Sequence, residues 1–230
     1  MKRLLTTISI AIGCLALQAQ TFTSGGMVYN VVDLDARIVE VAGVEQTPGE
    51  EGEATVYPHE ITVGNSITAD GSTFSVAGIG ASAFSNLDLL TNVVISEGVT
   101  YISDYAFTEC TGLRSVTLPE SLISVGRESF RGCTSLESIT LPSNLRDLPV
   151  RTFHGCTSLR EVASPEGMLT IGDYCFADCT SLAAMPVGEK AARIGAGSFR
   201  NCRALSSAEL PQSVVSVGEG CFEGCSTLTS

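Results

Sequence analysis

The stretch "AFTECTGLRSVTLP", residues 106–119, contains a phenylalanine, a cysteine three residues later, a leucine three residues after that, and a closing proline. Two similar stretches follow it, "SFRGCTSLESITLP" at residues 129–142 and "TFHGCTSLREVASP" at residues 152–165. Each copy is offset from the previous one by 23 residues. A constant offset of this size is the mark of an internal repeat, so the cysteine must be interpreted as part of an architecture.

Three apolar positions recur with this period and without an insertion. The phenylalanine column consists of Phe84, Phe107, Phe130, Phe153, Phe176, Phe199 and Phe222. The leucine column, six residues later, consists of Leu90, Leu113, Leu136, Leu159, Leu182, Leu205 and Leu228. The aliphatic column, five residues before each phenylalanine, consists of Ile79, Ile102, Val125, Leu148, Ile171, Ile194 and Val217. The repeats therefore extend from residue 79 to residue 230.

Each unit predicts one coil made of a strand, a turn, a short helical segment and a second turn. The pattern L-x-x-V-x-L ends in period-two alternation, which suits a short strand with one buried face. In "IGDYCFADC", residues 171–179, apolar residues lie three to five apart, the spacing of one or two helical turns. One coil cannot be stable alone, because ordering its backbone costs more free energy than the burial of its inward side chains contributes. The coils must stack, with parallel strands about 4.8 Å apart.

Units such as "IGDYCFADCTSL", residues 171–182, and "SVTLPESLISVG", residues 115–126, resemble the BspA-type leucine-rich repeats of bacterial surface and secreted proteins. The region before residue 79 is also similar to that family's N-terminal part, with hairpins such as "GGMVYNVVD", residues 25–33, and "STFSVAGIG", residues 72–80. The resemblance implies a leucine-rich repeat solenoid with parallel strands on a concave face, and a role in adhesion or protein binding. It supplies no catalytic residues and no cofactor.

Three positions depart from the repeat. Leu87 stands where later coils have cysteine, and Pro149 stands where other coils have a turn glycine. In "MPVG", residues 185–188, Pro186 falls inside a predicted strand, where its missing N–H weakens pairing. We therefore expect the fifth coil to be ragged at its concave edge.

The first 19 residues are typical of a signal peptide. Lys2 and Arg3 precede an uncharged apolar run, and Ala19 offers a small residue for cleavage. The run is short for a membrane span, so no span is expected in the mature chain. Lipid attachment at Cys14 is an alternative, although the preceding residues fit a lipobox poorly. The expected organisation is a signal peptide at 1–19, a β-rich cap at 20–78, and repeats at 79–230 that form six full units and one truncated unit.

The acidic balance of the chain restricts its partners. The net charge is −12 at pH 7, and removal of Lys2 and Arg3 leaves 11 basic and 25 acidic residues, a net charge of −14. Such a surface repels phosphate backbones and anionic lipid, so nucleic acid is excluded as a partner. The acidic stretch "EQTPGEEGE", residues 45–53, is expected to form a loop.

Eight cysteines remain after the leader, and an even number in an exported chain would ordinarily indicate disulfides. Six of them share one repeat position, and Cys175 and Cys221 each directly precede a phenylalanine. Leu87 occupies the same column, and leucine can fill an apolar slot but cannot form a bridge. We therefore predict buried thiols. The pairs Cys175/Cys179 and Cys221/Cys225 are the alternatives for bridging.

The candidate binding residues lie on the predicted concave strand face, between and beside the buried strand residues. They are Arg114, Ser115, Thr117, Glu137, Ser138, Thr140, Arg160 and Glu161. Stacking would align Arg114, Glu137 and Arg160 with alternating charge. Two interpretations remain open: a mutually neutralising ladder on a solvated face, or a hydroxyl-lined strip for an extended peptide or a glycan. Tyr105 and Tyr174 share a repeat position and offer a second candidate surface.

Other motifs have simpler explanations. "GIGASA", residues 78–83, resembles a dinucleotide-binding turn but is the first repeat's turn. His154 occupies a variable, solvent-facing position, and with His59 it is one of only two histidines, too few for an ordinary zinc site. We expect no enzyme, no metal and no cofactor.

The remaining functional interpretations are an exported module that binds a protein or glycan outside the cell, or a structural spacer without a ligand. Because the last unit stops at Ser230 without a polar cap, we also expect either a longer array or an end that pairs with another chain.

Overall fold

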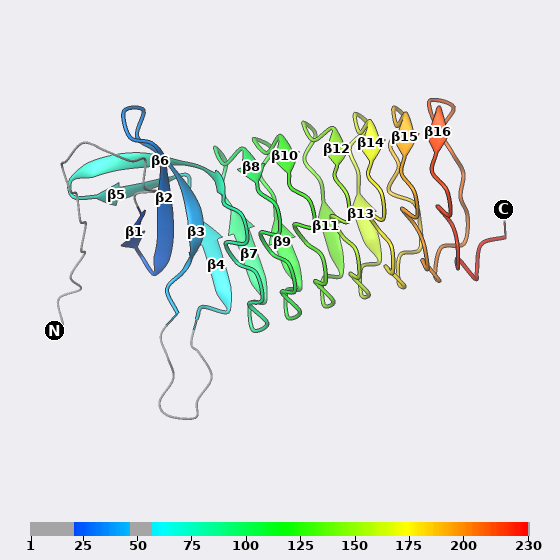
Figure 1. The fold of residues 1–230 in the computed structure, drawn as a ribbon, viewed down its shortest axis with the longest axis horizontal. Coiled ribbons are helices and arrows are strands. Elements are labelled where there is room, and N and C mark those ends of the chain that lie inside the picture. The colour runs from blue at the N-terminus through cyan, green and yellow to red at the C-terminus, as the bar shows by residue number, and fades with distance from the viewer. Residues whose placement is uncertain (1–20, 47–56, 230) are drawn as a thin grey trace, which may run out of the picture.

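The computed structural model describes residues 21–46 and 57–229. The predicted signal peptide, Cys14 and most of the predicted acidic loop lie outside these residues. Along the long axis of the molecule, an N-terminal sheet is followed by a regular row of coils (Figure 1). No helix occurs in the described ranges.

The N-terminal sheet is built from hairpins. Strands β1 (Thr21–Ser24), β2 (Met27–Asp33) and β3 (Ile38–Val44) pair in antiparallel order, and β5 (Ser66–Ala69) pairs with β6 (Ser72–Ile79) in a second hairpin. Strand β3 pairs with β6 in parallel, and β6 continues into the first coil by pairing with β8 (Tyr101–Ile102). The cap and the solenoid therefore share one continuous sheet.

Each regular coil contains two short strands, whereas the sequence predicts one. The first ladder contains β4 (Glu60–Val63), β7 (Asn92–Ile95) and β9 (Ser115–Thr117), followed by the pair β11 (Ser138–Thr140) and β13 (Glu161–Ala163). The second ladder contains β6, β8 and β10 (Ser124–Val125), followed by β12 (Asp147–Leu148), β14 (Thr170–Ile171), β15 (Arg193–Ile194) and β16 (Ser216–Val217). Neighbouring coils pair in parallel, for example Ser138 with Glu161 and Ile171 with Ile194, both 23 residues apart.

The predicted helical segment is wrong, because its backbone bonds to the neighbouring coil. Tyr105, Phe107 and Glu109 donate their N–H groups to carbonyls 22 residues ahead, at N···O distances of 2.7–2.9 Å. Two positions per coil also have positive φ, which a right-handed helix excludes. The first of these columns is Ser82, Tyr105, Glu128, Arg151, Tyr174, Gly197 and Gly220. The second is Asn86, Glu109, Gly132, Gly155, Asp178, Asn201 and Gly224.

The core consists of the predicted columns. Successive phenylalanine rings from Phe84 to Phe222 stack with centroids 5.1–5.7 Å apart, and from Phe107 onward their planes deviate by 8° at most. The leucine column is fully buried from Leu90 to Leu205. Aromatic pairs at this separation add about 0.5–1.5 kcal/mol each beyond the burial of their surface. The in-register stacking predicted from the repeat is confirmed.

Two prolines coincide with two of the interruptions of the ladders, and the break between β9 and β11 has no proline to explain it. In the second ladder, the N–H groups of Gly172 and Gly195 donate to the preceding coil at 2.8 Å, whereas Pro149, in the same column, has no N–H and lies where β10 and β12 fail to pair. In the first ladder, β13 is the last strand, and Pro186 lies one coil beyond Ala163. The predicted raggedness of the fifth coil is confirmed.

Candidate binding surface

The predicted binding residues lie together on one exposed face. We call this the strand-ladder face; it comprises the outward residues of β9, β11 and β13 and the residue that precedes each of these strands. All eight side chains predicted as candidates are exposed, and the central residue of each strand, such as Ile139, is buried. Strands β11 and β13 pair in register, and β9 precedes β11 by one repeat, so equivalent side chains recur once per coil along this face.

The charges on this face stack but do not form ion pairs. The Glu137 N–H donates to the Arg114 carbonyl at 3.5 Å, and the Arg160 N–H donates to the Glu137 carbonyl at 2.9 Å. Within the part of the chain that the structure describes, no ion pair joins these three side chains. The charge ladder considered from the sequence therefore has no direct ion pair among these three side chains. These charges remain available to solvent or to a ligand.

The hydroxyl groups of the face also have few internal partners. The Ser115 hydroxyl donates to Asn92 Oδ1 at 2.7 Å. For Thr117, Ser138 and Thr140, no side-chain hydrogen bond occurs among the described residues. A row of hydroxyl groups and charges without partners can exchange bound water for polar groups of a ligand.

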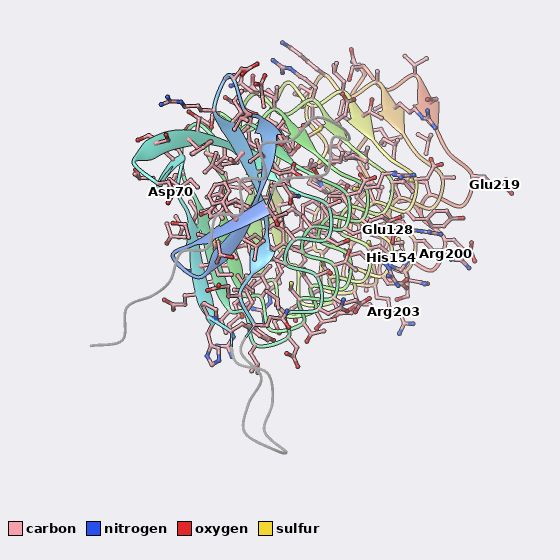
Figure 2. All side chains as sticks on the ribbon, turned by 60° about the vertical axis from the view of Figure 1, so that its left-hand side comes forward. Asp70, Glu128, His154, Arg200, Arg203 and Glu219 are labelled. Atoms are coloured by element: carbon pink, nitrogen blue, oxygen red, sulfur yellow. The ribbon has the colours of Figure 1, made fainter. Side chains whose placement is uncertain are left out.

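The ion pairs lie instead on a different surface, the turn ridge, formed by residues 103–111 and their equivalents in later coils. Arg127 pairs with Asp104 at 3.0 Å and Arg200 with Glu223 at 2.9 Å, and His154 lies 3.5 Å from Asp178. Figure 2 shows Glu128, His154 and Arg200 gathered on this ridge. Because its charges neutralise one another from coil to coil, the ridge is occupied by internal contacts.

The two tyrosines of the second candidate surface both lie on the turn ridge. Tyr105 is exposed and Tyr174 is half-buried, and the guanidinium carbon of Arg151 lies 5.7 Å from the centroid of the Tyr174 ring. They are three coils apart, and Arg151 covers one of them. They do not form a continuous aromatic surface.

The eight described cysteines are buried or partly buried thiols with internal hydrogen bonds or raised pKa values. Every cysteine of the repeat column donates its S–H to the phenylalanine carbonyl of the preceding coil, at S···O distances of 2.9–3.2 Å. Burial raises the pKa of Cys110 and Cys175 to about 12 and that of Cys221 to about 11. Such thiols stay protonated at neutral pH, and the thiolate is the reactive form. All eight described cysteines are free, as the buried-thiol prediction requires.

A sequence model of a known protein family matches the repeats. The description "BspA type Leucine rich repeat region" matches in six copies, over residues 77–205 and 148–230. The chain belongs to the BspA-type leucine-rich repeat family. No curated protein sequence matches it.

Solved structures of leucine-rich repeat proteins share this fold. A T. pallidum leucine-rich repeat protein is 26% identical with a TM-score of 0.77, and the match covers 90% of each chain. A leucine-rich repeat protein from Bacteroides ovatus is 24% identical with a TM-score of 0.65; the match covers 87% of this chain and 56% of that one. A leucine rich cell surface protein from Faecalibacterium prausnitzii is 19% identical with a TM-score of 0.50; the match covers 92% of this chain and 82% of that one.

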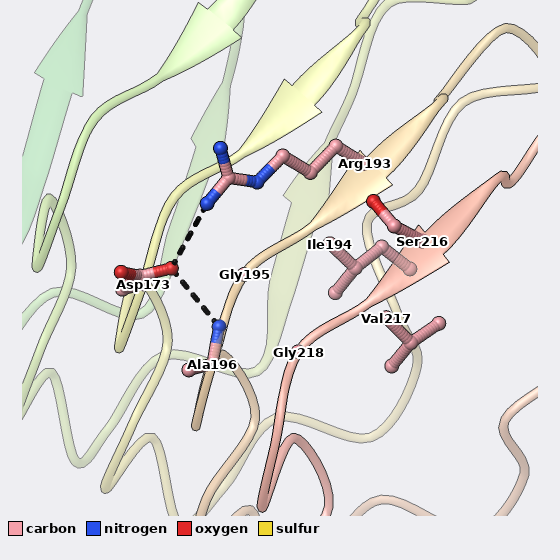
Figure 3. A pocket seen from close by; sticks show the side chains of 8 residues that line it. All are labelled: Asp173, Arg193, Ile194, Gly195, Ala196, Ser216, Val217 and Gly218. Atoms are coloured by element: carbon pink, nitrogen blue, oxygen red, sulfur yellow. Dashed lines mark hydrogen bonds and ion pairs between the residues drawn. The ribbon is translucent and has the colours of Figure 1, made fainter.

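The BspA-type solenoid has a hollow that its sequence pattern did not reveal. It has a volume of about 350 Å³ and is lined by Asp173, Arg193, Ala196, Ser216 and Gly218 among others (Figure 3). The sequence signal that could have found it is Ala196, a small residue in a column that includes Asp104, Arg127, Asp173 and Glu219.

Among residues 21–46 and 57–229, no group of three or more His, Cys, Asp or Glu side chains could hold a metal ion. The same residues contain no helix long and apolar enough to cross a membrane.

Proposed function

We propose that this BspA-type leucine-rich repeat protein is an exported binding module, displayed at the cell surface or secreted, that uses the strand-ladder face to bind a protein or a glycan. The observation that carries the proposal is the row of exposed charges and hydroxyl groups that repeats once per coil without internal ion pairs. The proposal assigns no catalytic residue and no cofactor.

The rigidity of the core supports this role. Stacked phenylalanine rings and intercoil hydrogen bonds fix the strands on which the ligand-facing residues stand. A surface that is already ordered loses little conformational entropy when it binds, so weak polar contacts can add up to useful affinity. Because the face carries no exposed aromatic side chain on β9, β11 or β13, recognition would depend on hydrogen bonds and charge.

The location outside the cell is also part of the proposal. It is supported by the apolar N-terminal stretch and by the described similarity to a protein named a cell surface protein. Cell fractionation followed by N-terminal sequencing of the mature protein is the test. We expect the protein outside the cytoplasm with an N-terminus near Gln20, and an intact Met1 in the cytoplasm would contradict the proposal.

An array of glycans and extracellular-matrix proteins tests the binding proposal. The protein is compared with the triple variant Arg114→Ser, Glu137→Ser and Arg160→Ser. A matched control carries Lys190→Ser, Glu166→Ser and Arg203→Ser, which remove the same charges at exposed positions outside the three strands. We expect the first variant to lose at least tenfold in affinity for the array ligand and the control to keep it. Equal binding by both variants would exclude the strand-ladder face.

A structural spacer is the second candidate function. The feature that favours it is the stack of seven rings, each within 5.7 Å of the next, which makes a stiff element between two ends. The same array separates the two functions, because a spacer would bind no ligand in either form of the protein.

A further inference from the structure

The column that contains Ala196 holds a built-in ion pair in an earlier part of the solenoid. There, Asp104 Oδ1 accepts the backbone N–H of Arg127 at 2.7 Å. Asp104 Oδ2 accepts Nε and Nη2 of the same arginine at 3.1 and 3.0 Å. One carboxylate thus binds the backbone of the next coil through one oxygen and a guanidinium fork through the other, a strong and directional arrangement.

The same backbone arrangement recurs three coils later without the arginine side chain. Asp173 Oδ1 accepts the backbone N–H of Ala196 at 3.0 Å, as Asp104 does from Arg127. Residues 173 and 196 each lie 69 positions after their counterparts, which is three repeats. Ala196 has no side chain to reach the second oxygen of Asp173, and both residues line the hollow of about 350 Å³. Among the described residues, Asp173 Oδ2 has no hydrogen-bond donor.

Arg193 does not replace the missing side chain. Its Nη2 lies 3.6 Å from Asp173 Oδ1, beyond hydrogen-bond distance, and its side chain is 62% exposed (Figure 3). It approaches from β15 and reaches the oxygen that already accepts the Ala196 N–H. Among the described residues, the second carboxylate oxygen of Asp173 therefore has no hydrogen-bond or ion-pair partner.

The precedent at Asp104 favours a guanidinium. The hollow is lined by one carboxylate, that of Asp173, and by one guanidinium, that of Arg193. Gly195 and Gly218 leave the hollow's backbone wall without side chains. Its geometry suits a flat group with several donors, because the carboxylate plane is already fixed by its backbone contact.

We propose that this hollow, the Asp173 pocket, binds the guanidinium group of an arginine side chain on a partner protein. The bound guanidinium takes the place that Arg127 occupies beside Asp104, and it donates to Asp173 Oδ2. Arg193 is displaced from its loose contact with Asp173 and is free to meet a carbonyl or carboxylate group of the partner. The pocket lies outside β9, β11 and β13, so the proposal does not depend on binding at the strand-ladder face.

Titration of the full, ¹⁵N-labelled chain with capped tripeptides tests the proposal by NMR. The probe is acetyl-Gly-Arg-Gly-amide, and its isosteric neutral control contains citrulline in place of arginine. We expect the arginine peptide to shift the amide signals of Ala196 and Gly195 in a saturable manner, and the citrulline peptide to bind at least tenfold more weakly. A third arm uses free L-arginine, and equal binding of the free amino acid would overturn the assignment to a partner protein.

Three variants locate the site. Asp173→Asn should weaken binding of the arginine peptide at least tenfold, and Ala196→Arg should abolish it by filling the pocket from within, as Arg127 does at Asp104. Asp104→Asn, the matched change at the occupied niche, should leave binding within twofold of the original. If Asp173→Asn fails to fold, Ala196→Arg decides alone, because its arginine has a natural precedent at position 127.

The proposal is overturned if the Ala196→Arg variant still binds the peptide, or if the citrulline peptide binds equally well. The triple variant of Arg114, Glu137 and Arg160 should retain the peptide response. Failure at the strand-ladder face and failure at the Asp173 pocket are therefore distinguishable.

Discussion

The thiol of Cys133 donates a hydrogen bond to the backbone carbonyl of Phe107, which lies one coil earlier at an S···O distance of 3.2 Å. The same carbonyl also accepts the Cys110 N–H at 3.2 Å. One cysteine thus fills a buried slot and bonds two coils together. In the first coil no earlier phenylalanine of the column exists to accept a thiol, and Leu87 fills the slot there.

Cys133→Ala should lower the free energy of unfolding by about 1–3 kcal/mol, because it removes a buried sulfur and the S–H donor. Cys133→Leu should also destabilise the protein by about 1–3 kcal/mol, because the later slot is built for a smaller side chain. Urea denaturation followed by circular dichroism measures both. Two variants as stable as the original protein would show that the thiol column contributes nothing to stability.

Thiol reactivity should follow burial. Cys225 is the only partly exposed cysteine of the eight described, and the other seven are buried. Among these eight cysteines, iodoacetamide at pH 8 should therefore modify only Cys225 in the folded protein and all eight in the denatured protein. Mass spectrometry of the alkylated chain counts the modified residues. Rapid modification of Cys133 or Cys156 under native conditions would contradict the buried column.

Stability should fall in alkali. Burial raises the pKa of Cys110 from 9.0 to about 12, so the folded chain keeps a proton that the unfolded chain loses above pH 9. The free energy of unfolding should therefore be unaffected by this group below pH 9 and decrease between pH 9 and 12, by up to about 1.4 kcal/mol per pH unit for each such thiol. Denaturation at a series of pH values measures the slope of the unfolding free energy against pH. Cys110→Ala should make this slope less steep by about 1.4 kcal/mol per pH unit, the contribution of one proton.

Gly155 tests the left-handed backbone of the turn ridge. Its φ is +75°, and an added Cβ would meet only Gly132 Cα and N, at 3.9 Å, so a substitution isolates the backbone effect. Gly155→Ala should cost about 1–2 kcal/mol of stability. Gly155→Asn should cost less than half as much, because asparagine tolerates this conformation and Asn86 and Asn201 adopt it in the same column. Equal losses would contradict this explanation.

The junction between cap and solenoid depends on Tyr101. Its hydroxyl donates to Glu40 Oε2 at 2.8 Å, and its ring covers Gly78, where a Cβ would collide with it. Tyr101→Phe should lower the free energy of unfolding by about 1–2 kcal/mol, since a hydrogen bond to a carboxylate is lost. The substitution should increase the rate of amide hydrogen exchange in β3 and β6 more than it does in β14. Uniform exchange rates after the substitution would contradict a local role of this contact.

The repeat and its core could be predicted from the sequence, but the backbone conformation of the turn ridge was predicted wrongly as helical. The columns of Phe107 and Leu113 stack as the period of 23 requires, because one inward position per coil has one environment. Apolar spacing alone suggested a helix there. The residues at positions 86, 109, 132, 155, 178, 201 and 224 are mostly Gly, Asn and Asp, and that composition indicates a left-handed backbone.

The candidate surface was predicted in position but not in its electrostatics. The alternation of Ser138, Ile139 and Thr140 places two side chains outward and one inward, so their exposure follows from the pattern. The formation of ion pairs does not follow from the pattern, since Arg127 forms an ion pair with Asp104 while Arg114 and Glu137 form none. Side-chain direction at the end of a strand depends on three-dimensional geometry that a period cannot supply.

The central claim is that consecutive coils lie in register around one stack of phenylalanine rings. Selective ¹³C labelling of phenylalanine, followed by a nuclear Overhauser experiment, tests it most directly. We expect contacts between the rings of residues 23 apart, from Phe84 to Phe199, and no such contact between rings 46 apart, such as Phe107 and Phe153. Rings 23 apart that show no contact, or rings exposed to solvent, would contradict the account.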